Sequence, residues 1–333
     1  MKTRVHAPTP AALRRLAAVL RRGELVAIPT ETVYGLAANA LDARACRRIF
    51  TAKRRPADDP LIVHVTDLRA AERLAEFNDA ARLLARTFWP GPLTLVLPKR
   101  DCVPAIVTSG QDTVAVRAPA HTLARKLLTL ARVPLAAPSA NPFGYVSPTT
   151  AAHVLDGLGG RIPHVLDGGA CAVGVESTIV DVSEPGRLVV LRPGAISAHE
   201  LRTALAKGLL SVRVSKRPRE KTLAPGLLDQ HYSPHTPLTL VTRAPRMAEE
   251  CENAGVIFWQ RPREVATRRN IFALTRSGAA DDAARSLYAV LRAADASGFA
   301  RLICEKAPAH AGALGEAIND RLRRAAGKRH APH

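Results

Sequence analysis

Hydroxyl, cationic and imidazole side chains that could bind an anionic substrate gather between residues 28 and 64. Residues 30–34 (TETVY) carry two threonine hydroxyls and a phenol, residues 53–55 (KRR) carry three cations, and His64 adds an imidazole. Cations beside a loop can neutralise a polyphosphate and stabilise negative charge that develops in a transition state. These residue types at this spacing therefore predict a site for an anionic substrate, although a KRR run alone is more often the solvated end of a helix.

Two strands and a helix must bring these groups together. An apolar run ends at Pro29, which cannot donate to a sheet ladder, so we predict a strand over 25–29 followed by a ligand-binding loop. A helix predicted over 42–54 carries the cations at its C-terminus. A second predicted strand, 61–65, carries His64, which by itself would more often be a satisfied core histidine.

The rest of the N-terminal half alternates helices with strands. We predict helices over 10–22, 121–131 and 198–206, a helix opened by Ser147-Pro148 and running through Leu155, and strands over 93–97, 113–117, 134–137, 177–182 and 188–191. A Pro-Gly turn separates the last two strands and is typical of a hairpin. Because some strands are joined by helices and others by a hairpin, we expect a twisted mixed sheet flanked by helices.

A shorter α/β alternation begins near residue 237. Strands are predicted over 238–241, 255–259, 271–274 and 301–304, with helices near 246–253, 279–293 and 313–325. The pattern predicts a small Rossmann-like parallel α/β domain. With 333 residues the chain exceeds the usual size of one domain. We therefore predict an α/β protein with domains at 1–206 and 237–333, and a linker, 207–236, that could fold over the first domain as a lid.

Ten short motifs carry a family resemblance. They are PTETVYGL (29–36), KxRP (53–56), PLIVH (60–64), WPGPLT (89–94), VAVR (114–117), APSAN (137–141), VEST (175–178), LRPG (191–194), APG (224–226) and HYSP (231–234). In type and order they resemble the threonylcarbamoyl-AMP synthases, whose catalytic domain has the YrdC-like fold. The last two motifs resemble the linker of the longer, two-domain members. The resemblance implies a YrdC-like catalytic domain at the N-terminus.

The resemblance also implies a reaction and its partners. The enzyme would be a nucleotidyltransferase that condenses L-threonine, bicarbonate or CO2, and ATP into threonylcarbamoyl-AMP, with release of pyrophosphate. Magnesium would bridge the phosphates of ATP. A separate transferase would then use the product to form threonylcarbamoyladenosine in tRNA. Such a reaction needs no protein nucleophile, because positioning and electrostatics supply most of the rate.

Individual site residues follow from the matching positions of these motifs. The expected catalytic cations are Lys53 and Arg55. The positions that match the threonine pocket are Thr32, His64, Arg117, Ala137 and Ser177. The positions that match the nucleotide side are Arg55, Asp59, Thr113, Ser139, Ser147, Arg192, His231 and Tyr232. Taken singly, each serine or threonine could equally be a capping or turn hydroxyl.

Two features qualify the nucleotide site. Neither common phosphate-binding loop, GxxxxGK[ST] or GxGxxG, occurs in the sequence, so side chains and strand-end amides would have to bind ATP. Asp59 stands where the related motif usually has asparagine. A carboxylate there would repel a triphosphate unless magnesium or a neighbouring arginine offsets its charge.

Charge leaves a second class of function open. The net charge of +19 favours contact with RNA, and the two alternatives to a synthase are a non-catalytic RNA-binding module and a carbamoyl-adenylate-handling domain of hydrogenase-maturation proteins. Of the 48 basic residues only nine are lysine, which also fits a compositional origin of the charge. Transient contact with tRNA is one expectation. The hydrogenase-maturation alternative is disfavoured because the acylphosphatase and cysteine-rich regions of those proteins have no counterpart here.

Cysteine content and hydropathy favour a soluble globular protein. Five scattered cysteines form no CxxC pair, which argues against a disulfide framework or a zinc site. No apolar run has the roughly 18 residues of a membrane span. The Arg-rich first 23 residues resemble a presequence, but a helix start at Pro10 and a stop at Gly23 favour an integral helix. We expect a cytoplasmic protein without a membrane segment.

Overall fold

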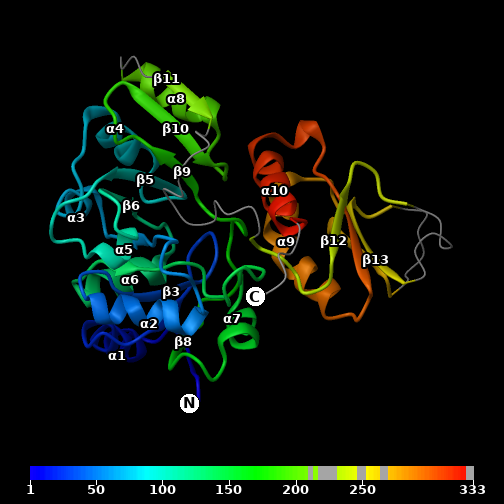
Figure 1. Ribbon diagram of the computed structural model, residues 1–333, viewed down its shortest axis with the longest axis horizontal. Coiled ribbons are helices and arrows are strands. Elements are labelled where there is room, and N and C mark those ends of the chain that lie inside the picture. Colours follow the sequence, from blue (N-terminus) through cyan, green and yellow to red (C-terminus); the bar gives the residue numbers. More distant parts are fainter. Residues whose placement is uncertain (209–212, 217–230, 246–252, 263–268, 328–333) are drawn as a thin grey trace.

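The computed structural model describes residues 1–208, 213–216, 231–245, 253–262 and 269–327, which form two sheets with their helices. The larger sheet belongs to the N-terminal domain and the smaller one to the C-terminal domain (Figure 1). Both are α/β units, as the alternation in the sequence predicts. Within these described ranges, no helix combines the length and the apolar character that a membrane span requires. Cys46, Cys102, Cys171 and Cys304 carry free thiols.

The N-terminal sheet contains eleven strands in the order β1-β8-β2-β3-β7-β4-β6-β5-β9-β10-β11. Its strands are β1 (Arg4–His6), β2 (Val26–Ile28), β3 (Gly35–Asn39), β4 (Ile62–His64), β5 (Leu93–Pro98), β6 (Thr113–Arg117), β7 (Leu135–Ala136), β8 (His164–Leu166), β9 (Thr178–Asp181), β10 (Arg187–Arg192) and β11 (Arg213–Lys216). Parallel and antiparallel pairs occur together, because β4 runs parallel to β6 while β9 and β10 form an antiparallel hairpin. The predicted mixed sheet is confirmed.

Eight helices of the described N-terminal residues flank this sheet. They are α1 (Pro10–Arg21), α2 (Ala43–Lys53), α3 (Leu68–Ala71), α4 (Asp79–Phe88), α5 (Ala105–Thr108), α6 (Thr122–Ala131), α7 (Ala151–Leu158) and α8 (Ala198–Lys207). In α2 the Asp42 side chain accepts from the amides of Arg44 and Ala45, and Arg54 ends the helix in the left-handed conformation. An N-cap at one end and a left-handed residue at the other thus fix where the helix begins and ends.

Three sequence predictions need correction. Residues 29–34 are a hairpin loop, because β3 returns antiparallel to β2 with Ile28 opposite Gly35. The sequence did not predict β3, since its GLAAN segment lacks the β-branched and aromatic residues typical of strands. The helix predicted from Ser147 begins at Ala151, where Thr150 caps it. Within the predicted linker, β11 pairs in parallel with β10, so residues 213–216 are part of the first sheet.

The C-terminal sheet is fully parallel, in the order β12-β15-β13-β14. Its elements are β12 (Leu238–Val241), β13 (Ala254–Gln260), β14 (Ile271–Thr275), α9 (Ala280–Asp295), β15 (Arg301–Glu305), the 3-10 helix η1 (Ala309–Ala311) and α10 (Gly312–Ala325). The predicted parallel sheet is confirmed. The predicted helix near 246–253 lies almost wholly outside the described residues.

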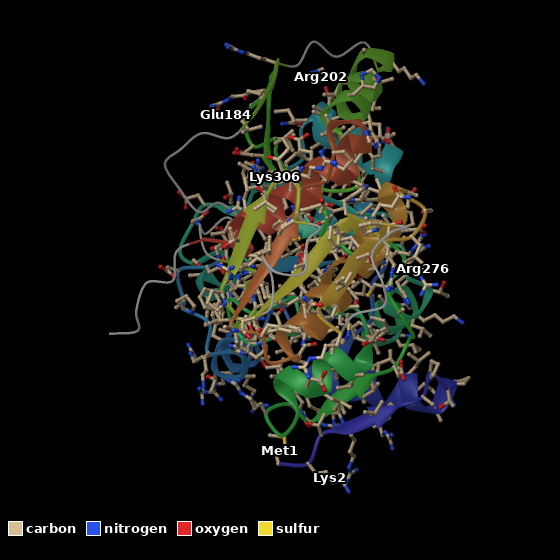
Figure 2. The ribbon with its side chains drawn as sticks, turned by 90° about the vertical axis from the view of Figure 1, so that its right-hand side faces the viewer. Met1, Lys2, Glu184, Arg202, Arg276 and Lys306 are labelled. Atoms are coloured by element: carbon tan, nitrogen blue, oxygen red, sulfur yellow. The ribbon has the colours of Figure 1, made fainter. Side chains whose placement is uncertain are left out.

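Helices α9 and α10 lie on the side of the C-terminal sheet that faces the N-terminal domain (Figure 1). After a 90° turn that brings the right-hand side of Figure 1 toward the viewer, the strands of this sheet lie in front of the N-terminal domain (Figure 2). Val33, Val146 and Val175 of the N-terminal domain belong to the same apolar cluster as Leu287 and Leu291 of α9. The two domains therefore share a hydrophobic core.

The backbone of Gly174 packs directly against α9. A Cβ at this position would lie 2.3 Å from the carbonyl oxygen of Ala284 and 2.5 Å from Cα of Arg285. Gly186 has a φ of 74°, similar to the 82° of Gly174, but a Cβ at Gly186 would meet nothing within 4 Å. The two glycines share the backbone requirement and differ in the contact with α9.

We expect Gly174→Ala to loosen the contact between the domains and Gly186→Ala to leave it intact. Each alanine costs about 1–2 kcal/mol for the left-handed backbone, and only the first adds a clash with a helix. Hydrogen exchange should therefore rise in α9 and α10 for Gly174→Ala alone. Equal exchange in the two variants would contradict the close approach.

Candidate functional site

One pocket collects ten of the residues that the sequence singles out. It opens where the 29–34 loop, the ends of β4, β6 and β10, and residues 231–232 converge. The predicted residues in its wall are Thr32, Arg55, His64, Arg117, Ala137, Ser139, Ser177, Arg192, His231 and Tyr232. Residues predicted to bind threonine and residues predicted to bind ATP thus line the same cavity.

The enclosed part of the cavity is small. Its volume is about 40 Å³, enough for a few water molecules at roughly 10–15 Å³ each. Pockets that bury drug-sized ligands hold about 300–1,000 Å³. A whole ATP molecule therefore exceeds the enclosed space in this arrangement of the side chains.

His64 and Arg117 lie side by side because β4 and β6 are parallel with these residues in register. Burial, together with the charge of Arg117, lowers the pKa of His64 to about 3. The imidazole is therefore neutral at pH 7. Its Nδ1 has no hydrogen-bond partner among the described residues, which leaves one ring nitrogen available to a ligand.

Arg117 already has an internal carboxylate partner. Its Nη2 donates to Oε1 of Glu31 at 2.5 Å, its Nη1 donates to Oγ1 of Thr32 at 2.9 Å, and its Nε donates to the carbonyl oxygen of Gly91 at 3.2 Å. Burial opposes ionisation of Glu31, but the charge of Arg117 together with hydrogen bonds from Arg117 and the backbone outweighs it, and the pKa of Glu31 lies below its ordinary value. Sequence analysis missed Glu31, although it lies inside the PTET motif.

Ser177 and Arg192 form a bonded pair on the opposite wall. The guanidinium of Arg192 donates through Nε to the carbonyl oxygen of Ser177 at 3.1 Å and through Nη2 to its Oγ at 3.2 Å. Oγ of Ser177 also lies 2.8 Å from Oγ1 of Thr94. A residue of the predicted threonine side is thus held by one of the predicted nucleotide side.

Arg55 lines the pocket and forms a buried ion pair with Asp59. The two side chains are 2% and 1% exposed, and Nη2 of Arg55 lies 2.9 Å from Oδ2 of Asp59. Arg55 also donates to the carbonyl oxygens of Asp59 and Pro60. Burial raises the pKa of Asp59 although Arg55 opposes this, and burial lowers the pKa of Arg55. The sequence analysis requires magnesium or a neighbouring arginine to offset the negative charge of Asp59. In the structure Arg55 is that arginine.

Lys53 supports the site from behind instead of lining it. Its side chain is buried, and Nζ donates to the carbonyl oxygens of Ser139 and Asn141, both at 2.5 Å. Burial, followed by the charge of Arg55, lowers the pKa of Lys53 well below its ordinary value. In this structure Lys53 fixes the 137–141 loop, whereas the sequence predicts that it points at phosphates.

His231 and Tyr232 enter the pocket from the C-terminal side of the predicted linker. Both are buried, and their rings meet edge to face at 4.1 Å between centroids. Burial and the charge of Arg55 lower the pKa of His231 well below its ordinary value. The described part of the segment therefore folds back onto the N-terminal domain, as the lid hypothesis requires.

Besides Lys53 and Asp59, two further predicted residues, Thr113 and Ser147, lie away from the cavity wall. Thr113 begins β6, at the opposite end of the strand from Arg117. Ser147 is fully buried and donates to Oε1 of Glu176 at 2.6 Å, and Glu176 itself lines the pocket. Glu176 is the second carboxylate that sequence analysis missed, and its place in the VEST motif is the signal that could have indicated it.

Comparisons with known proteins identify the family of both domains. Residues 18–194 match a family model described as "Telomere recombination", and residues 196–327 match one described as "Threonylcarbamoyl-AMP synthase, C-terminal domain". The threonylcarbamoyl-AMP synthase of Pyrococcus abyssi is 41% identical, with 95% of this chain and 94% of that protein covered. The synthase of Bacillus subtilis is 38% identical over 95% and 93%.

A solved structure resembles the chain over nearly its whole length. The crystal structure of P. abyssi Sua5 complexed with L-threonine matches with a TM-score of 0.87 and 39% identity, and covers 97% of this chain and 98% of that one. Family models thus account for both domains, and a relative of similar length shares their arrangement. The chain belongs to the threonylcarbamoyl-AMP synthase family.

Proposed function

We propose that this chain catalyses the reaction of its family, in which L-threonine, bicarbonate or CO2, and ATP give threonylcarbamoyl-AMP and pyrophosphate. The observation that carries the proposal is the single pocket that unites Thr32, His64, Arg117, Ala137 and Ser177 with Arg55 and Arg192. Residues suited to an amino acid and cations suited to phosphates thus lie within reach of one another. The reaction requires that proximity.

The chemistry needs positioned substrates and no covalent intermediate with the protein. The amino group of threonine adds to CO2 and loses a proton, which gives a carbamate. A carbamate oxygen attacks the α-phosphorus of ATP as the bond to the β-phosphate oxygen breaks, and pyrophosphate leaves. Negative charge grows on the phosphates during this step, and Arg55 and Arg192 are the pocket cations suited to offset it.

Magnesium would enter with the nucleotide as Mg·ATP, bound to its phosphates. Over the part of the chain that the structure describes, no group of three His, Cys, Asp or Glu side chains is arranged to hold a metal. The Asp59 carboxylate is engaged with Arg55. The protein would therefore contribute the cationic wall and the nucleotide would bring the metal.

On the threonine side, Arg117 is suited to the substrate carboxylate. A guanidinium fork binds a carboxylate through two parallel hydrogen bonds. Glu31 now occupies Nη2 of that fork, so the substrate must share or replace this contact. His64, neutral at pH 7, and Thr32 offer the remaining polar groups of this wall.

Delivery of the product to a separate transferase and transient contact with tRNA stay predictions. A role as a carbamoyl-adenylate-handling domain of hydrogenase maturation is disfavoured, because the C-terminal domain matches that of threonylcarbamoyl-AMP synthases. A non-catalytic RNA-binding module has no comparable observation in its favour.

The decisive experiment is pyrophosphate release from ATP, measured with both co-substrates and with each one omitted. We expect release only when threonine and bicarbonate are both present. Serine and valine in place of threonine serve as matched substrates that lack the methyl or the hydroxyl group. Release that does not depend on threonine would contradict the proposed function.

We expect Arg117→Lys to weaken threonine binding by about 10- to 100-fold, because the charge stays and the fork is lost, and hydrogen bonds to charged groups contribute about 1.5–3 kcal/mol. Affinity for an ATP analogue should change by less than about threefold. Calorimetry with each ligand measures both constants. Arg125→Lys, at an exposed position of α6, is the matched control. A larger loss for the nucleotide would place Arg117 on the ATP side.

We expect Asp59→Asn to destabilise the fold without abolishing pyrophosphate release. Removing one partner of a buried ion pair costs about 3–5 kcal/mol, because the other charge stays buried without compensation. The exposed neighbour variant Asp58→Asn should change stability by less than about 0.5 kcal/mol. Urea unfolding and the pyrophosphate assay measure the two effects. Loss of activity in a folded Asp59→Asn variant would show that the carboxylate takes part in the chemistry.

A further inference from the structure

Arg321 of α10 is the largest fully buried side chain of the described residues, and it reaches from the C-terminal domain into the wall of the pocket. We propose that Arg321 is a positioning residue, which holds Ser177, Arg192 and Ser147 in place for the nucleotide-dependent step. This inference rests on the proposed function and assigns a part of it to the C-terminal domain.

The first argument is where the guanidinium donates. Its Nη2 donates to the carbonyl oxygen of Glu176 at 3.3 Å and its Nη1 to the carbonyl oxygen of Pro193 at 2.6 Å. These carbonyls belong to the residue just before Ser177 and the residue just after Arg192. Arg321 therefore hydrogen-bonds to the backbone immediately before Ser177 and immediately after Arg192.

The second argument is the Glu176 carboxylate. Its Oε2 accepts from Nε of Arg321 at 3.0 Å and from the hydroxyl of Tyr288 at 2.7 Å, while its Oε1 accepts from Oγ of Ser147. Burial opposes ionisation of Glu176, but the charges of Arg321 and Arg192 and the hydrogen bonds from Ser147 and Tyr288 together outweigh it, and the pKa of the carboxyl stays below its ordinary value. An ionised Glu176 thus orients the Ser147 hydroxyl, and two residues of the C-terminal domain orient Glu176.

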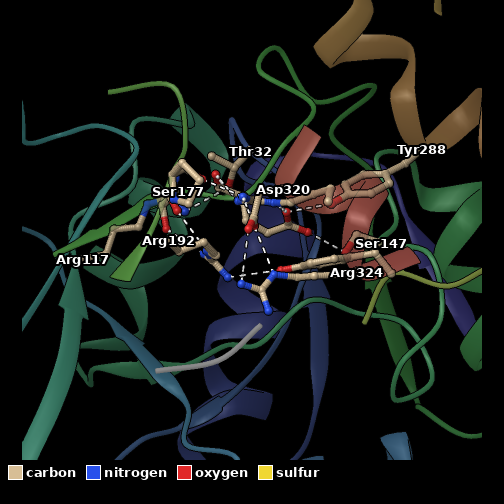
Figure 3. A network of polar contacts seen from close by, with 12 residues as sticks. Thr32, Arg117, Ser147, Ser177, Arg192, Tyr288, Asp320 and Arg324 are labelled. Carbon is tan, nitrogen blue, oxygen red and sulfur yellow. Dashed lines mark hydrogen bonds and ion pairs between the residues drawn. The ribbon is translucent and has the colours of Figure 1, made fainter. Parts of the chain in front are cut away.

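The third argument is the set of contacts that the Tyr232 ring makes with the C-terminal domain. Its ring stacks on Tyr288 at 5.9 Å between centroids and lies under the guanidinium of Arg321 at 5.7 Å. Figure 3 shows the network that links Ser177 and Arg192 with Ser147, Tyr288 and Asp320. The same two residues of α9 and α10 therefore support the pocket wall and the described end of the lid.

A role in docking alone fits this geometry less well. Buried ion pairs add little net stability, and apolar residues often replace them without loss. The two domains already share an apolar core. Three hydrogen bonds from one guanidinium to the Glu176 carboxylate and to two carbonyls beside pocket residues fix positions, which an apolar contact would not do.

The test compares Arg321→Lys with the wild type in steady-state pyrophosphate release. Lysine keeps the charge but cannot reach three acceptors at once. We expect kcat/KM for ATP to fall about 10- to 100-fold, the usual effect of misplacing groups that orient a site. The dissociation constant for threonine should rise less than kcat/KM for ATP falls. Of the threonine-side residues, Ser177 lies next to a carbonyl that Arg321 binds, whereas Thr32 is held by Arg117 and His64 lies beside Arg117 on the neighbouring strand. The exposed neighbour variant Arg323→Lys should behave as the wild type.

Tyr288→Phe keeps the aromatic stack and removes one hydrogen bond to Glu176, so it tests the inference even if Arg321→Lys does not fold. Its kcat/KM for ATP should fall about 3- to 30-fold. Hydrogen exchange in α9 separates positioning from docking, because it should rise in Gly174→Ala and stay near the wild type in Tyr288→Phe. Unchanged ATP kinetics in folded Arg321→Lys and Tyr288→Phe would overturn the inference and leave the proposed function intact. A wild-type chain without threonine-dependent release would overturn both.

Discussion

Buried arginines need acceptors, and the pocket is built around that need. Removing a guanidinium from water is costly unless a carboxylate or carbonyl oxygens replace the lost solvation. Arg117 lies against Glu31, Arg55 against Asp59 and Arg321 against Glu176. Each of the three arginine side chains is at most 4% exposed. Arg117 and Arg55, two of the cations that suit an anionic substrate, are therefore engaged with internal carboxylates in this arrangement.

This pairing explains how Arg55 and Arg117 can both line the pocket without unbalanced buried charge. It also implies how the site would open. An incoming carboxylate or phosphate offers the same kind of acceptor as Glu31 or Asp59, so the exchange of partners can be nearly balanced in free energy. Binding would then depend on the geometry of the acceptors more than on bulk charge, which is where arginine differs from lysine.

Sequence reasoning located the half of the site that adjacent strands define. The family resemblance places His64 and Arg117 in one pocket, and the sequence places each on a predicted strand. The structure adds that these strands are parallel neighbours with the two residues in register. Sequence reasoning missed Glu31 and Glu176, because the arginines that bind them lie 86 and 145 residues away in the chain. The direction of Lys53 also escaped prediction. Helical periodicity places the residue at the end of α2, but only the 137–141 loop determines which oxygens its amine meets.

The C-terminal domain is joined to the first domain by more than a tether. Residues 213–216 complete the edge of the first sheet, Val33, Val146 and Val175 pack into the second core, and Tyr232 fills the pocket wall. Cutting the chain after residue 207 would remove an edge strand and expose this apolar patch, and it would also remove His231 and Tyr232 of the predicted linker. Loss of activity in such a fragment would therefore not identify the lid as the cause. Single substitutions at the interface, which leave the sheet and the core in place, separate these contributions.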